Sequence, residues 1–210
     1  MPLLADILTR VRQDIRDTAS PQEFTDSELT RFVERARDEV SAAQPREREA
    51  TLTTDGTTRD LSLATLTNRL DVYSVEYPTG QWPPEYVSFE VWGDVLTMHL
   101  DAVPAGAQNA KVRWGSIHTL DAAGTTLTER QEDVVVLGAA AYALSAFAAQ
   151  GSHKLLAGGA TAQRALSSEA ASRTRAYTGA LRRLRSRLRR SQLYAPSTPG
   201  ASQTTDPGPW

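Results

Sequence analysis

Apolar residues recur at helical spacing at the start of the chain and predict two amphipathic helices. The first spans residues 3–17, and the second begins at Thr25, which forms a capping-box pattern with Glu28. Pro45 ends the second helix because proline cannot donate the next backbone hydrogen bond. The apolar stripes are Leu4, Leu8, Val11 and Ile15 in the first helix and Leu29, Phe32, Val33, Ala36 and Val40 in the second. Residues 1–48 should therefore form a helical hairpin.

The pattern then changes to the two-residue alternation of β-strands. The predicted strands are residues 51–53, 59–63, 70–77, 86–92, 95–100 and 111–117. Asp55-Gly56 predicts a tight hairpin between the first two strands, and Gly93-Asp94 predicts another between the fourth and fifth. Alternation places Val87, Phe89 and Val91 on one face, and Leu96, Met98, Leu100, Val112 and Trp114 on buried faces. Short strands of this kind suggest a small antiparallel sheet, sandwich or barrel.

Three tryptophans lie in the β region. We expect Trp114 in the core and Trp92 packed beside its hairpin turn, although with Trp82 they could instead form a stacking platform for bases or sugars. Trp82 lies between prolines in residues 78–84, where a strand cannot continue. It should therefore occupy an exposed or partner-facing loop, as an interface anchor does.

Two long helices are predicted after the β region. Thr128 and Gln131 form a second capping box, and the helix that begins there runs to about Gln150. It is apolar around most of its circumference, so it must be buried in this domain or between subunits. Gly138 and the alanines after it leave a smooth surface that another helix can approach closely.

A fourth helix is expected from about residue 160 to residue 194, after a flexible glycine-rich joint at residues 151–159. Its apolar stripe contains Leu166, Ala170, Tyr177, Leu181, Leu184 and Leu188. Residues 195–210 are rich in proline, glycine, serine and threonine, and such a segment cannot offset the entropy of folding alone. We therefore interpret it as an extended, partner-binding tail.

Together these patterns predict an α+β fold. The N-terminal hairpin and the two long C-terminal helices should form a helical bundle, with a small antiparallel β-domain inserted between them and an extended tail after them. The expected divisions of the chain are residues 1–48, 49–120, 121–194 and 195–210.

Charge is distributed unevenly along the chain. Residues 1–169 carry 15 basic and 24 acidic residues, whereas residues 170–210 carry eight basic residues and one acidic residue. The nearly neutral total therefore combines an acidic body with a basic end.

Candidate catalytic and cofactor chemistry is sparse in this sequence. It contains no cysteine, so disulfides and thiolate ligands are excluded. The histidines, His99, His118 and His153, lack metal-ligand spacing, and we expect them to be structural or solvent-facing. Phosphate-loop and nucleophile-elbow motifs are absent. Glu132 and Asp133 are adjacent on a helix, so they diverge by about 100° and favour a role at the helix start over paired catalysis. We expect neither an enzyme nor a cofactor.

Membrane insertion and secretion are also disfavoured. The longest apolar stretch, residues 134–149, is shorter than the roughly 20 residues that a spanning helix needs. Residues 1–10 lack the pattern of a signal peptide, so we expect the protein to stay inside the cell that makes it.

The arginines of the last helix are the main candidates for partner binding. They allow three interpretations: a solvated surface, a sequence-independent phosphate contact, or an assembly element that meets an acidic partner. Assembly is favoured because the body of the protein is acidic. The candidate residues are Arg182, Arg183, Arg185, Arg187, Arg189 and Arg190, together with Tyr194, Trp210 and Trp82.

The order of these parts, with FTDSEL at residues 24–29 and TLTERQEDVVVLGAAAYAL at residues 126–144, resembles the head-to-tail connector (adaptor) proteins of tailed bacteriophages. The resemblance implies a virion structural protein of the neck, assembled in the host cytoplasm. It implies a ring of many copies, with twelve as the expected number, docked on the portal protein and enclosing the DNA channel. The helices from residues 128 and 160 would build the ring wall, and residues 182–210 would be the docking arm. The next tail or stopper protein would bind below, and DNA would pass without sequence-specific contact.

Two other functions remain open from the sequence. One is a DNA- or RNA-binding accessory protein that uses the arginine-rich helix. The other is a carbohydrate-active or other enzyme that uses the β region, which the lack of a converging acid/base pair disfavours.

Overall fold

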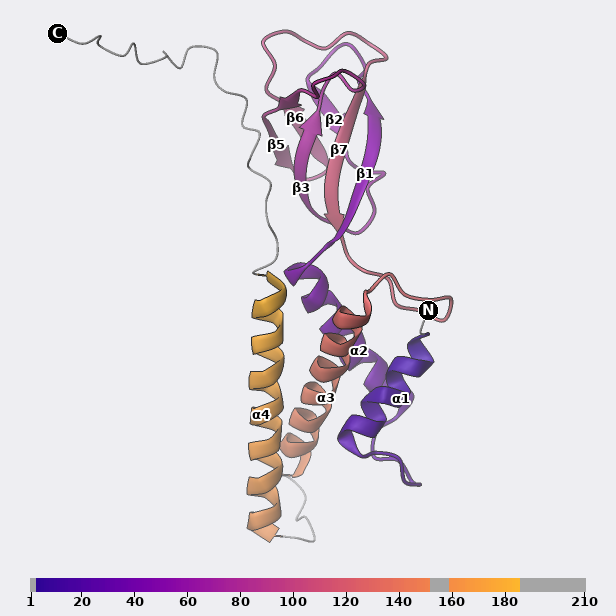
Figure 1. Ribbon diagram of the computed structural model, residues 1–210, viewed down its shortest axis with the longest axis vertical. Helices are drawn as coiled ribbons and strands as arrows, with labels where there is room; N and C mark the ends of the chain where they lie inside the picture. The colour runs from indigo at the N-terminus through magenta and orange to yellow at the C-terminus, as the bar shows by residue number, and fades with distance from the viewer. Residues whose placement is uncertain (1–2, 152–158, 186–210) are drawn as a thin grey trace, which may run out of the picture.

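The protein has an α+β fold, as the sequence predicts. The computed structural model describes residues 3–151 and 159–185, which form four helices and seven strands. The helices are α1 (Leu4–Ile15), α2 (Asp26–Ala43), α3 (Glu129–Gly151) and α4 (Gly159–Arg185). They form a bundle at one end of an elongated molecule, and the strands form a separate β unit at the other end (Figure 1). Of the joint predicted at residues 151–159, Gly151 ends α3 and Gly159 begins α4, and residues 152–158 lie outside the described residues, as does everything predicted after Arg185.

Local sequence signals fix where two of the helices begin. The Glu28 amide donates to Thr25 Oγ1 at 3.3 Å, and the Thr25 amide donates to Glu28 Oε2 at 2.9 Å, which completes the predicted capping box of α2. At the start of α3, the Thr128 amide donates to Gln131 Oε1 at 2.8 Å in the same arrangement. α2 ends at Ala43, ahead of Pro45.

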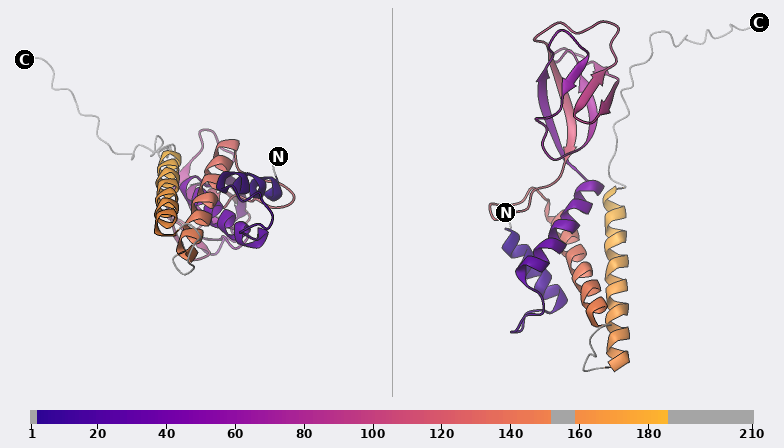
Figure 2. Two further views of the ribbon diagram at one scale, coloured as in Figure 1. Left: turned by 90° about the horizontal axis from the view of Figure 1, so that it is seen from below. Right: turned by 180° about the vertical axis from the view of Figure 1, so that it is seen from behind.

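α3 is the central helix of the bundle. It packs against α1, α2 and α4 (Figures 1 and 2). Gly138 allows the closest approach, because a Cβ atom there would lie 2.5 Å from the Tyr177 ring on α4. The apolar core around α3 includes Ile7, Val11, Leu29, Val33, Ala36, Val135, Ala139, Tyr177 and Leu184. α3 is long and apolar enough to cross a membrane by length and composition, a test that the core helix of a bundle also passes.

The β unit consists of two antiparallel sheets. One contains β1 (Arg46–Thr53), β7 (Asn109–Ser116), β3 (Arg69–Glu76) and β4 (Tyr86–Val87), in that order. The other contains β2 (Asp60–Ser62), β6 (Val95–Met98) and β5 (Phe89–Trp92). A second, separate core lies in this unit and includes Leu61, Leu63, Val75, Leu96, Met98, Val112 and Trp114. The inward positions predicted for Leu96, Met98, Val112 and Trp114 are confirmed.

The predicted hairpin at Asp55-Gly56 is wrong. β1 pairs with β7 and β2 pairs with β6, so the chain crosses from one sheet to the other at this turn. Asp55 Oδ1 accepts hydrogen bonds from the amides of Thr57 and Thr58, which forms a compact turn without joining two paired strands. Gly56 has a φ of +81°, and a Cβ atom there would lie 2.6 Å from the Gly106 amide nitrogen. The Asp-Gly signal therefore marks a turn, but partners distant in sequence decide which strands pair.

The single strand predicted for residues 86–92 is divided between the two sheets. β4 pairs with β3, whereas β5 pairs with β6, and the change occurs at Ser88. Trp92 lies opposite Val95 across the hairpin at Gly93-Asp94, so this second predicted hairpin is confirmed.

Candidate assembly surfaces

The C-terminal end of α4 presents an exposed cluster of arginines. Arg182, Arg183 and Arg185 are exposed in its last turn, next to the buried Leu184. Cations at this position are favourable because the carbonyl end of a helix is negative. This end of α4 is the one nearer the β unit (Figure 1). The other candidates, Arg187, Arg189, Arg190, Tyr194 and Trp210, lie outside the described residues.

Trp82 is exposed, as predicted, but it is not adjacent to the arginines. Its side chain is 91% exposed in the loop between β3 and β4. The neighbouring Thr79 amide donates to Asn109 O at the start of β7, whereas the last residue of β7, Ser116, pairs with Arg46 directly after α2. Trp82 therefore lies at the end of the β unit away from the helices. The structure separates this candidate from the arginine cluster by the length of the β unit.

Trp92 contradicts its predicted packing. Its side chain is 88% exposed on β5, beside the 42% exposed Val95 across the hairpin. Arg69 Nη2 donates to the Gly93 carbonyl at 2.7 Å, and Arg69 pairs with Ser116, so this hairpin lies at the helix-proximal end of the β unit. Val91, which was predicted on the same face as Val87 and Phe89, is also 40% exposed, whereas Val87 and Phe89 pack partly buried against the core of the β unit. The three tryptophans form no common platform, since Trp114 is buried.

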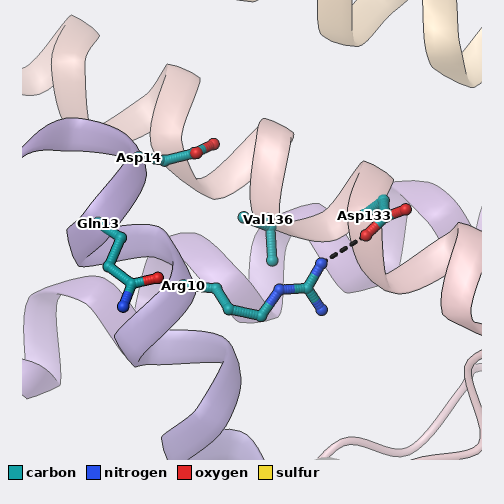
Figure 3. A pocket seen from close by; sticks show the side chains of 5 residues that line it. All are labelled: Arg10, Gln13, Asp14, Asp133 and Val136. Atoms are coloured by element: carbon teal, nitrogen blue, oxygen red, sulfur yellow. Dashed lines mark hydrogen bonds and ion pairs between the residues drawn. The ribbon is translucent and has the colours of Figure 1, made fainter.

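A shallow polar groove lies between α1 and α3. It has a volume of about 310 Å³ and is lined by Arg10, Gln13, Asp14, Asp133 and Val136 (Figure 3). Arg10 bridges the groove and forms ion pairs with Asp133 and with Glu132, the latter at 3.6 Å. The side chains of Asp133 and Asp14 are 63% and 44% exposed, so both carboxylates remain accessible to solvent.

Glu132 is buried, which its expected role at the helix start did not indicate. Only 5% of the residue is exposed, and this burial raises the pKa of its carboxyl group, while the nearby Arg10 guanidinium lowers it. Asp133 points into the groove (Figure 3). No local sequence pattern predicts the ion pairs of Glu132 and Asp133 with Arg10, because Arg10 comes from a helix more than 100 residues earlier.

The described histidines occupy different environments. His118 is buried, and its Nε2 lies 3.1 Å from the Gln44 carbonyl oxygen while its Nδ1 lies 3.2 Å from Thr126 Oγ1. This confirms the structural role expected for it. His99 is exposed, and His153 lies outside the described residues. Within residues 3–151 and 159–185, His, Asp and Glu side chains form no cluster of three or more that could hold a metal ion.

No protein-family model matches the chain, and no curated protein matches it by sequence. Among solved structures, the chain is similar to one in the structure described as "Neck of empty GTA particle computed with C6 symmetry". The similarity covers 64% of this chain and 76% of that chain, with 12% sequence identity and a TM-score of 0.31.

Proposed function

We propose that the protein is a structural subunit of a phage head-to-tail connector ring, located in the virion neck between head and tail. In this proposal many copies, twelve as the expected number, surround the DNA channel and dock on the portal protein through the C-terminal arm. The next tail or stopper protein binds the ring, and DNA passes without base-specific contacts. The protein acts by assembly and needs neither catalysis nor a cofactor.

The observation that carries this proposal is the separation of interaction features on an elongated molecule. The basic helix α4 lies on one side of α3, α1 of an acidic helical hairpin lies on the other side, and a highly exposed tryptophan lies at each end of the β unit. Exposed tryptophan and arginine are the residues that most often carry binding energy in protein interfaces. This distribution suits a subunit that contacts several neighbours at once. The element order and the FTDSEL and TLTERQEDVVVLGAAAYAL segments, which resemble those of connector proteins, also favour this class.

The proposed function does not involve insertion into a membrane. α3 is apolar, but its flanks are covered by α1, α2 and α4, which is the environment of a bundle core.

Native mass measurement tests the proposal directly. The purified full-length chain, alone and with the portal protein of the same particle, should form a discrete closed oligomer that binds the portal. A strict monomer that ignores the portal would contradict the proposal. Truncation after Gln192 should weaken portal docking and leave the helical circular dichroism unchanged, whereas global unfolding would show that the tail belongs to the core.

A nucleic-acid-binding accessory protein is the second candidate, and the exposed arginines of α4 are the observation that favours it. Phosphate binding should weaken steeply as the logarithm of salt concentration rises, because counterion release drives it. A ring held partly by buried contacts should persist at moderate salt. Titration of labelled duplex DNA at several salt concentrations therefore separates the two candidates.

A further inference from the structure

The outer face of α4 carries three arginines in a straight line. Arg164, Arg175 and Arg182 are separated by 11 and 7 residues, which are about three and two helical turns, so they share one face. All three are exposed. The opposite face contains Ala170, Tyr177 and Leu184, which are buried against the bundle. We call Arg164, Arg175 and Arg182 the arginine stripe; it extends over about 27 Å at 1.5 Å per residue.

Small residues lie between these arginines on the same side of α4. The side chains that flank the stripe are Ser168, Ala171 and Thr178. They are exposed, and they leave the three guanidinium groups as the most prominent features of the surface. The one acidic residue of the described part of α4, Glu169, is bound to Arg173 at 3.0 Å. The stripe is therefore a basic surface. Within the described part of α4, the one carboxylate near it is already paired with a different arginine.

The opposite flank of the bundle presents acidic residues. α4 lies on one side of α3 and α1 lies on the other (Figures 1 and 2). Around α1 and its groove with α3, the exposed acids include Asp14, Glu23 and Asp133, and Asp6 and Glu129 are exposed there as well. Arg10 of α1 pairs with Asp133, and Arg173 of α4 reaches Asp14 at 3.4 Å; the two carboxylate side chains remain 63% and 44% exposed and keep oxygen capacity for a second donor.

The acids and the arginines lie at matching levels along the bundle. Gly138 on α3 touches Tyr177 on α4, and these helices run antiparallel, so Asp133 lies near the level of Arg182. Asp14 binds Arg173, which places it near the level of Arg175.

The third pair is Glu23 and Arg164. Contacts of neighbouring residues place both at the end of the bundle away from the β unit. The Phe24 ring packs on the Phe147 ring with centroids 6.2 Å apart, so Glu23 lies near the C-terminal end of α3. Gln163 on α4 donates to the Ala148 carbonyl at 2.6 Å, which places Arg164 at that same end. Three basic positions on one flank therefore correspond in height to three acidic positions on the other.

We propose that the arginine stripe of one copy binds the acidic α1 flank of the next copy, with Arg182, Arg175 and Arg164 facing Asp133, Asp14 and Glu23. A ring closed by rotation needs two different, complementary surfaces on each subunit. If the rotation axis runs along the bundle, residues at equal heights on opposite flanks meet. The partner that binds the stripe is a second copy of the chain, because acidic residues at the complementary positions are present on this same chain. This inference rests on the proposed connector function and specifies its ring contact.

The test uses the full-length chain at about 0.1 M salt, where the screening length is about 10 Å. The variant Arg164→Glu/Arg175→Glu should keep its helical circular dichroism and its melting temperature, and it should lose the ring by native mass spectrometry. The matched control, Arg31→Glu/Arg130→Glu, changes the net charge equally at two exposed arginines outside the stripe, and it should keep the ring. Adding Glu23→Arg to the stripe variant should restore part of the ring population, because it re-forms one opposite-charge pair.

Each contrary result has a distinct meaning. A ring retained by the stripe variant, equal loss in the control, or no recovery with Glu23→Arg would overturn the inference and leave the connector function standing. A stripe variant that keeps the ring and loses DNA binding would assign the stripe to nucleic acid instead. A wild-type chain that stays monomeric with and without the portal would overturn the proposed function itself.

Discussion

His118 shows how one residue links the two parts of the molecule. It follows β7 in the chain. Its backbone amide donates a hydrogen bond to Ser41 Oγ on α2 at 3.0 Å. Its ring lies between two backbone carbonyl oxygens, with Gln44 O 3.1 Å from Nε2 and Thr126 O 3.1 Å from Nδ1, and the protonated nitrogen of the neutral ring can donate to the carbonyl beside it. Burial lowers the pKa of His118 and outweighs the hydrogen bonds to the Gln44 and Thr126 carbonyls, which raise it, while the nearby Arg46 guanidinium lowers it further.

This environment predicts a pH dependence of stability. Since the folded-state pKa of His118 lies below the ordinary value of 6.5, the unfolded chain binds the proton more readily. The contribution of His118 should therefore be complete above that value and should decline as pH falls below it. Urea unfolding between pH 8 and pH 5 should show a steeper loss of stability in the wild type than in His118→Gln. Parallel pH profiles for the two proteins would contradict this prediction.

Single residues also show which signals the sequence contains. The two capping boxes were predictable because each connects residues three positions apart. The burial of Glu132 was not predictable, since its partner Arg10 is brought near only by the packing of α1 on α3.

At the scale of elements, close helix packing depends on Gly138. A Cβ atom at this position would lie 2.5 and 2.7 Å from Tyr177 ring atoms and 3.0 Å from Ala36 Cβ. α3 therefore meets both α2 and α4 at a residue that has no side chain.

Replacement of Gly138 by alanine should be destabilising for this reason. Overpacking of a tight contact typically costs about 1–3 kcal/mol, which exceeds the roughly 1 kcal/mol that alanine gains over glycine in a helix. Gly179→Ala is the matched control on α4, because its Cβ would meet only Arg183 Nη1, at 3.6 Å. That variant should be neutral or stabilised. Thermal and urea unfolding of both variants provide the measurement, and equal effects would contradict the packing argument.

The pairing of strands could be predicted from the sequence only where the paired strands are neighbours in the chain. The hairpin at Gly93-Asp94 was predicted correctly because its strands are neighbours in both sequence and space. The Asp55-Gly56 turn has an equally strong local signal, yet β1 pairs with β7 more than 50 residues away. Both arrangements satisfy the backbone hydrogen bonds of a strand, so only the packing of the two sheets distinguishes them.

At the scale of the whole molecule, two separate cores support two units. The core of the helical bundle and the core of the β unit share no residue. They are joined where β1 follows α2 and where residues 117–128 lead from β7 to α3. A defect in one core should therefore act mainly on that unit.

Leu96→Ala tests this independence. Leu96 is fully buried in the β unit, and truncation of such a side chain costs about 2–5 kcal/mol. Hydrogen exchange should increase in residues 46–116 and change little in α1, α2 and α3. Val33→Ala, a fully buried position of the bundle, should give the reverse pattern. Equal loss of protection in both units after either substitution would show that they unfold as one.

By itself the sequence determined the features set by neighbouring residues: the α+β class, the two capped helix starts, the inward positions of Leu96 and Met98, and the division into an acidic body and a basic end. Its prediction that Trp82 is exposed was also correct, because prolines exclude the loop from a strand. Tertiary structure alone decided the partners of β1 and β2, the exposure of Trp92, the burial of Glu132 and the alignment of opposite charges across the bundle. These depend on contacts between residues far apart in the chain, and such contacts follow from packing whole elements together, which no local pattern encodes.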